Sequence, residues 1–156
     1  MIRPVTPADV PVILRFVREL AMYEREPDAV RATELMLADA LFGAHPAAEA
    51  VLAEMDGAPV GFALFFHNFS TWTGRRGLYL EDLYVTPAAR GAGMGKALLR
   101  HLAAVAVERG CQRFEWSVLD WNAPAIAFYR AMGAVGMEEW TVQRVEGDAL
   151  MKLAGR

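Results

Sequence analysis

The spacing of apolar residues along the chain predicts three helices in its first two thirds. Over residues 8–23 the apolar side chains recur at helical intervals, behind the N-cap residue Thr6 and a proline at the first helical position. Thr33 is placed to cap a second helix, which Gly43 ends. Residues 93–109 give a third helix with one apolar face.

Shorter apolar runs, rich in β-branched and aromatic residues, predict strands. They lie at residues 2–5, 49–55, 58–69, 78–85, 113–119 and 139–145. Asp56-Gly57 joins the second and third runs and predicts a hairpin. Residues 70–77 form a loop, a short helix follows Asn122, and residues 147–154 form a last helical turn or two. This order mixes hairpins with crossover helices, which predicts an α/β sandwich around a mixed sheet.

Composition narrows the class of protein. The 156 residues suit a single domain, 1–156, with 54% apolar and 22% charged residues. A net charge of −3 argues against a nucleic-acid partner, and no apolar run is long enough to span a membrane. The single cysteine, Cys111, suits a reducing compartment, so we expect a cytoplasmic protein. The three histidines lack ligand spacing, and no metal is expected.

A glycine-rich turn stands where the strand at 78–85 gives way to the helix at 93–109. The turn reads "RGAGMG", residues 90–95, and neither the dinucleotide fingerprint nor the nucleotide P-loop has its spacing. Main-chain N–H groups at such a turn, next to a helix N-terminus, bind anions. Arg90 and Lys96 add positive charge, so the turn predicts a diphosphate site.

The same residues resemble the coenzyme A loop of the GCN5-related N-acetyltransferase (GNAT) superfamily. Its signature is Arg or Gln, two residues, Gly, one residue, then Gly or Ala, and Arg90, Gly93 and Gly95 occupy these positions. The stretches "YLEDLYV", "VLDWNAPAIAFYRAMGA" and "EGDALMKLA" extend the resemblance to the diamine (spermidine/spermine) and thialysine acetyltransferase branch. The likeness covers nearly the whole chain.

This resemblance implies a fold and a cosubstrate. The fold is a sandwich with a mixed, mostly antiparallel sheet, a splayed central strand pair and helices on both faces. The cosubstrate is acetyl-CoA, with no metal. Contacts to it are implied for Leu83, Tyr84, Val85, Arg90, Gly91, Ala92, Gly93, Met94, Gly95, Lys96 and Asn122.

Acetyl transfer to an amine requires removal of a proton, because an amine with a pKa near 10.4 is almost wholly protonated at pH 7. Glu81 and Asp82 are the candidates to accept it. A regular strand would direct them to opposite faces, whereas a β-bulge would change their directions. By resemblance, both line the amine pocket and Glu81 is the water-mediated base. The resemblance also makes Tyr129, seven residues after Asn122, the acid that protonates the leaving thiolate.

The acceptor amine is expected to be small and cationic. By resemblance, Tyr23, Glu24 and Trp72 join Glu81 and Asp82 around it, because carboxylates and aromatic rings suit a cation on a methylene stem. A polyamine, a short diamine, thialysine or lysine all fit this description. Acetylation of a protein or peptide, and a non-catalytic coenzyme A-binding module, stay open as alternatives. The branch resemblance implies a homodimer.

Overall fold

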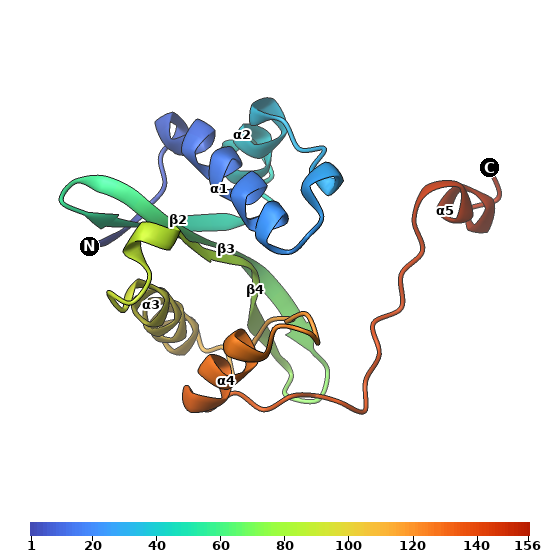
Figure 1. Ribbon diagram of the computed structural model, residues 1–156. Helices are drawn as coiled ribbons and strands as arrows, with labels where there is room; N and C mark the ends of the chain where they lie inside the picture. Colours follow the sequence, from blue (N-terminus) through green and yellow to red (C-terminus); the bar gives the residue numbers. More distant parts are fainter. The chain divides into compact units, whose positions relative to one another are not determined.

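The computed structural model describes all residues from 1 to 156, and five strands in it form one sheet (Figure 1). Their order is β1 (Ile2–Pro4), β2 (Glu49–Met55), β3 (Ala58–Ser70), β4 (Arg75–Val85) and β5 (Phe114–Glu115). The first four pair antiparallel, and β5 pairs parallel to β4. The predicted mixed, mostly antiparallel sheet is therefore confirmed.

The helices match the apolar periods closely. They are α1 (Val10–Tyr23), α2 (Glu34–Phe42), α3 (Met94–Glu108), α4 (Ala123–Ala131) and α5 (Gly147–Leu153), with 3-10 turns at Pro7–Asp9, Pro27–Ala29 and Pro87–Ala89. Thr33 caps α2 as predicted, because its hydroxyl accepts a hydrogen bond from the main-chain N–H of Met36 at 3.2 Å. None of these helices is both long and apolar enough to cross a bilayer.

The chain forms two compact units, Met1–Ser117 and Val118–Arg156. The first holds the whole sheet with α1, α2 and α3, and the second holds α4 and α5. Within the first unit, α1 and α2 cover one face of the sheet and α3 covers the other (Figure 1). On the first face, Ile13 and Phe16 of α1 pack with Leu52, Phe62 and Tyr84, all of them buried.

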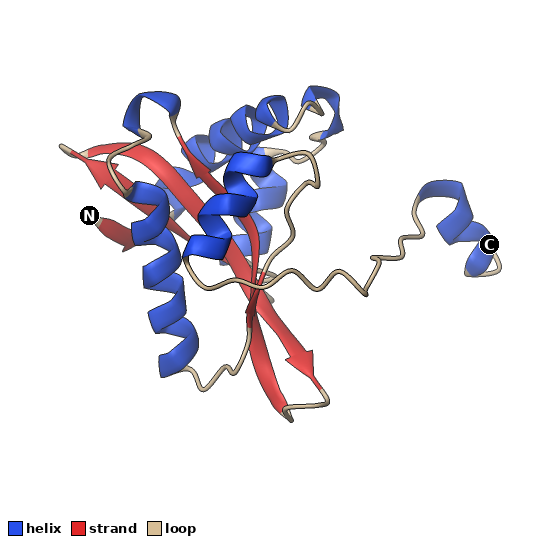
Figure 2. Cartoon of the chain, turned by 60° about the horizontal axis from the view of Figure 1, so that its bottom comes forward, coloured by secondary structure: helices blue, strands red, loops and turns tan.

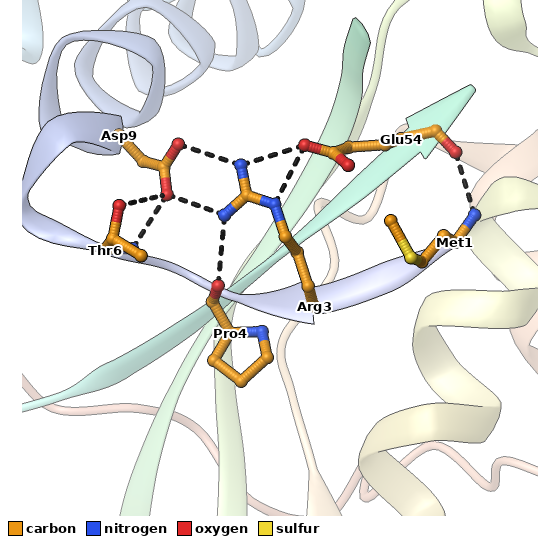
Figure 3. Close-up of polar contacts among 6 residues, drawn as sticks. All are labelled: Met1, Arg3, Pro4, Thr6, Asp9 and Glu54. Carbon is orange, nitrogen blue, oxygen red and sulfur yellow. Dashed lines mark hydrogen bonds and ion pairs between the residues drawn. The ribbon is translucent and has the colours of Figure 1, made fainter. Parts of the chain in front are cut away.

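A cluster of ion pairs stabilises the N-terminal strand β1 within this unit. The guanidinium of Arg3 donates to both carboxylate oxygens of Asp9, at 2.8 and 3.0 Å, and to Glu54 at 2.9 Å (Figure 3). The main-chain N–H and hydroxyl of Thr6 also donate to Asp9. Hydrogen bonds from the Arg3 guanidinium hold the pKa of Asp9 down at about 2. The cluster joins β1, β2 and the start of α1.

Three predicted elements differ from the structure. The β3–β4 hairpin extends beyond Glu49, the first residue of β2 (Figure 2), so β4 begins at Arg75 inside the predicted loop 70–77. The strand predicted at 113–119 is reduced to Phe114–Glu115. The strand predicted at 139–145 is wrong, because the structure has no strand there. A strand requires a partner for its main-chain groups, and the unit Val118–Arg156 contains none.

Candidate active site

A β-bulge in β4 lies at the predicted pair of acids. Leu64 of β3 pairs with Asp82, and the next residue, Phe65, pairs with Leu80, so Glu81 is the extra residue. Adjacent residues of β3 face opposite sides of the sheet, and Leu80 and Asp82 therefore do so as well. Asp82 shares its face with Tyr84, which packs under α1.

Next to this bulge, β4 and β5 part. The two strands pair only at Leu78 with Phe114 and at Tyr79 with Glu115. From Leu80 to Val85, β4 has no strand partner on this side. This is the splayed strand pair that the family resemblance implies, and it leaves main-chain groups of β4 open to a ligand.

Burial and like charge act together on the acids at this place. The pKa of Asp82 rises to about 6 because its carboxyl is partly removed from water, and because Glu81 and Glu24 lie near enough to repel its negative charge. Burial also raises the pKa of Glu24, which directly follows α1. Glu81 itself is exposed on the bulge. The structure therefore brings the predicted acids Glu24, Glu81 and Asp82 together, with an affinity for positive charge.

Tyr23 and Tyr84 lie beside these acids and are joined through Arg90. The guanidinium carbon of Arg90 is 5.3 Å from the Tyr23 ring centroid and 5.8 Å from the Tyr84 ring centroid. The hydroxyl of Tyr84 donates to Glu19 at 2.8 Å. Because the Tyr84 ring is buried with Phe16, its side chain is part of the core, and only its main chain lies on the open edge of β4.

The glycine turn leaves main-chain groups at the start of α3 open to an anion. Gly91 and Gly93 have φ angles of +87° and +79°, which L side chains rarely adopt. A Cβ at either position would meet no protein atom within 4 Å, so space is open at the main chain. Helix α3 starts directly after Gly93 without a side-chain cap, and its first N–H groups therefore remain available to an anion. Arg90 and Lys96 are both exposed here.

Trp72 lies apart from the acids within this unit. It stands in the turn between β3 and β4, 79% exposed, with the Arg113 guanidinium over its ring at 5.7 Å. Six residues of β4 separate the start of that strand from Glu81, which is about 20 Å of strand. Within a single copy of the chain, the structure therefore does not bring Trp72 next to Glu24 and Asp82, with which it was predicted to surround the acceptor.

Asn122 and Tyr129 belong to the second unit. Asn122 is buried and caps α4, because its side-chain oxygen accepts from the main-chain N–H of Ala125 at 3.4 Å. Tyr129 is half-buried two turns further along α4, with its ring centroid 5.5 Å from that of Phe128.

The sequence analysis did not identify Glu19 as a residue near the site. Its carboxylate accepts a hydrogen bond from the hydroxyl of Tyr84, 65 residues away, and only the folded chain shows this contact.

The comparisons with known proteins agree with this fold. The family model "Acetyltransferase (GNAT) family" matches residues 14–134, and the match spans both units. The chain belongs to the GNAT family of acetyltransferases. As a member it is an N-acetyltransferase, and acetyl-CoA is the cosubstrate of the family.

Two relatives and one solved structure show which acetyltransferases the chain is similar to. Thialysine N-epsilon-acetyltransferase of Sus scrofa is 40% identical over 167 residues, covering 100% of this chain and 98% of the relative. L-ornithine N5-acetyltransferase of Arabidopsis thaliana is 32% identical, covering 97% of this chain and 86% of the relative. Among solved structures, an integron cassette protein from the mobile metagenome of V. cholerae has a TM-score of 0.83 and 32% identity, covering 100% of this chain and 98% of that one.

Proposed function

We propose that this enzyme transfers an acetyl group from acetyl-CoA to the amine of a small dicationic or amino-acid acceptor, of which thialysine, lysine, ornithine and short diamines are the leading examples. The observation that carries the proposal is the cluster of Glu24, Glu81 and Asp82 beside the opening between β4 and β5. Three carboxylates in one place favour an acceptor with more than one positive charge. The names of the full-length relatives agree with that chemistry.

The coenzyme is expected along the glycine turn. The main-chain N–H groups of residues 90–95 and the start of α3 would hold its linked phosphates, with Lys96 adding charge at the exposed side. The bound acetyl-CoA supplies an acyl thioester as the reactive group. The main chain of Leu83 and Val85 would donate hydrogen bonds to the acyl end, and the lack of a strand partner on this edge of β4 supports that role.

Two carboxylates can take up the amine's proton, and they differ in environment. Glu81 is exposed on the bulge, which supports its predicted role as a base acting through water. Asp82 is more buried, and its pKa of about 6 makes it a stronger proton acceptor than an ordinary aspartate. We therefore extend the role to Asp82: it binds the ammonium group and relays its proton towards Glu81.

Protonation of the leaving thiolate is assigned to Tyr129, with Asn122 positioning the pantetheine arm. A tyrosine hydroxyl with a pKa near 10 can donate to a thiolate, whose conjugate acid has a pKa near 8.5, when the two are held together. Replacing Tyr129 by Phe should lower kcat at least tenfold and leave the Kd for acetyl-CoA within about twofold. An unchanged kcat would remove Tyr129 from this role.

The decisive experiment measures release of free thiol from acetyl-CoA with a panel of amines. The panel contains thialysine, lysine, ornithine, putrescine, spermidine and a peptide with a free N-terminus. We expect the largest kcat/KM with one of the first four, and a fall of at least tenfold in that value for Asp82→Asn. Preference for the peptide would overturn the acceptor class, and coenzyme binding without any transfer would favour a non-catalytic module.

The enzyme is further proposed to act as a cytoplasmic homodimer. The branch resemblance supports the dimer, and so do the exposed aromatic residues Phe69 and Trp72 at the end of the β3–β4 hairpin, at 66% and 79% exposure. The single cysteine suits the compartment. Small-angle scattering of the purified protein tests the dimer, and a monomeric mass at micromolar concentration would contradict it.

A further inference from the structure

Arg90 belongs to the candidate coenzyme loop by sequence, but its side chain points to the candidate acceptor site. Its Nε donates to the main-chain oxygen of Val85 at 3.1 Å, which folds the side chain back over the end of β4. From there the guanidinium reaches the rings of both Tyr84 and Tyr23. One side chain thus connects the turn at 90–95 with the end of α1.

The two rings on which Arg90 lies differ in how firmly they are held. The Tyr84 ring is 6% exposed, its centroid lies 5.7 Å from that of Phe16, and its hydroxyl donates to Glu19. Tyr23 is 42% exposed and is the last residue of α1, directly before Glu24. Tyr84 therefore acts as a fixed platform for Arg90, and Arg90 in turn limits where the more exposed Tyr23 ring can lie.

We infer that Arg90 is a positioning residue for the acceptor: it holds Tyr23, and with it the end of α1 that carries Glu24, in the arrangement that binds the amine. The inference rests on the proposed function, since it takes these residues as the acceptor site. It also gives the coenzyme loop an effect on acceptor binding. A ligand that orders residues 90–95 fixes the main chain of Arg90, and the stacked position of Tyr23 becomes more populated.

Binding of coenzyme and acceptor should accordingly be coupled, and the coupling must be reciprocal. A guanidinium over a partly exposed aromatic ring corresponds to a change of about two- to fivefold in a binding constant. The same factor sets the expected coupling, because the Arg90–Tyr23 contact is the connection between the two sites. Acceptor KM should change with this contact, whereas kcat should not, since neither side chain takes part in proton transfer.

A double-mutant cycle tests the inference on the full-length enzyme. The variants are Arg90→Met, which keeps the stem and removes the guanidinium, Tyr23→Leu, which removes the ring, and the pair together. Arg100→Met is the matched control, because it removes one positive charge from an exposed position on α3 that has no assigned role in binding coenzyme or acceptor. Tyr23→Phe is the conservative variant, since it keeps the ring. Acceptor KM, kcat and the Kd for acetyl-CoA are measured for each.

We expect Arg90→Met to raise the acceptor KM about two- to fivefold with kcat kept, and to do so in the Tyr23→Phe background as well. In the Tyr23→Leu background it should have no further effect, and Arg100→Met should leave the acceptor KM unchanged. Equal effects of Arg90→Met with and without the Tyr23 ring would overturn the inference. An acceptor KM that Arg100→Met raises equally would also overturn it, because loss of a positive charge alone would then explain the effect.

Failure of the proposed function is recognised separately. If the wild-type enzyme acetylates no amine of the panel, the assignment of the acceptor site falls, whatever the cycle shows. The urea midpoints of the same four proteins then still decide whether Arg90 holds Tyr23. Non-additive midpoints support the contact, and additive midpoints refute it.

Discussion

Replacing Asp82 by Asn should make the protein more stable at neutral pH. The carboxyl of Asp82 is held beside Glu81 and Glu24 in a half-buried position, and its pKa rises from 3.8 to about 6 on folding. A group whose folded pKa lies above its unfolded pKa loses its proton more easily in the unfolded chain. Ionisation of Asp82 therefore lowers the free energy of unfolding as the pH rises from 4 through 6.

The magnitude follows from the size of the shift. About two pKa units correspond to about 3 kcal/mol once the folded carboxyl is fully ionised, as it is at pH 7.5. At pH 4.5 the folded carboxyl is still protonated, and the same linkage gives only about 1 kcal/mol. An asparagine carries no charge at either pH, so the Asn variant should be more stable by about these amounts.

Urea unfolding at pH 7.5 and pH 4.5, followed by circular dichroism, measures both differences. Glu81→Gln is the control, because Glu81 is exposed on the same bulge, and its stability should differ from wild type by less than about 1 kcal/mol. Equal stability of Asp82→Asn and wild type at pH 7.5 would refute the reasoning. An advantage that stayed constant between the two pH values would show that the carboxyl's charge is not its cause.

Three other substitutions test the scaffold around the site. Arg3→Ala should lower stability by about 2 kcal/mol in urea unfolding, because it leaves the Asp9 carboxylate without its main partner, and the loss should shrink as the pH falls towards 2 and Asp9 takes up a proton. Gly93→Ala should weaken acetyl-CoA binding at least tenfold by calorimetry, with a loss of about 1 kcal/mol in stability from its positive φ. Gly61→Ala places a Cβ 2.6 Å from the main-chain oxygen of Tyr84, and should cost about 2 kcal/mol in stability and lower kcat/KM by moving β4.

Sequence patterns predicted those parts of the fold that short-range physics determines. Asp56 and Gly57 both adopt positive φ angles in the β2–β3 turn, as their residue types favour. The cap at Thr33 depends on groups three residues apart. The strand predicted at 139–145 failed for the opposite reason. Its apolar alternation is typical of a strand, but a strand also depends on a partner that may be anywhere in the chain.

Some features of the candidate site could likewise be predicted from the sequence, and others depend on contacts between distant parts of the chain. Residues 90–95 lie together in the sequence, whereas the bulge at Glu81 was implied by the family resemblance and not by the local pattern. The gathering of Glu24 with Asp82 depends on α1 crossing β4, which the family resemblance implied and composition did not. The contact of Arg90 with Tyr23 has no signal in the sequence, because it depends on how one side chain turns at the end of β4.

The bulge explains why the acids lie at this point of β4. Without an extra residue, Leu80 and Tyr84 would face the same side of the sheet, and only one of the two helical layers could receive them. In the structure Tyr84 joins the core under α1, while Leu80 is buried on the other face, where α3 packs against β4. The strand must therefore change the face of its side chains between these residues, and Glu81 is the residue at which it does. The local break in pairing that serves both cores is also what exposes Glu81 and directs Asp82 towards Glu24. The packing of the fold and the charge of the site thus depend on the same residue.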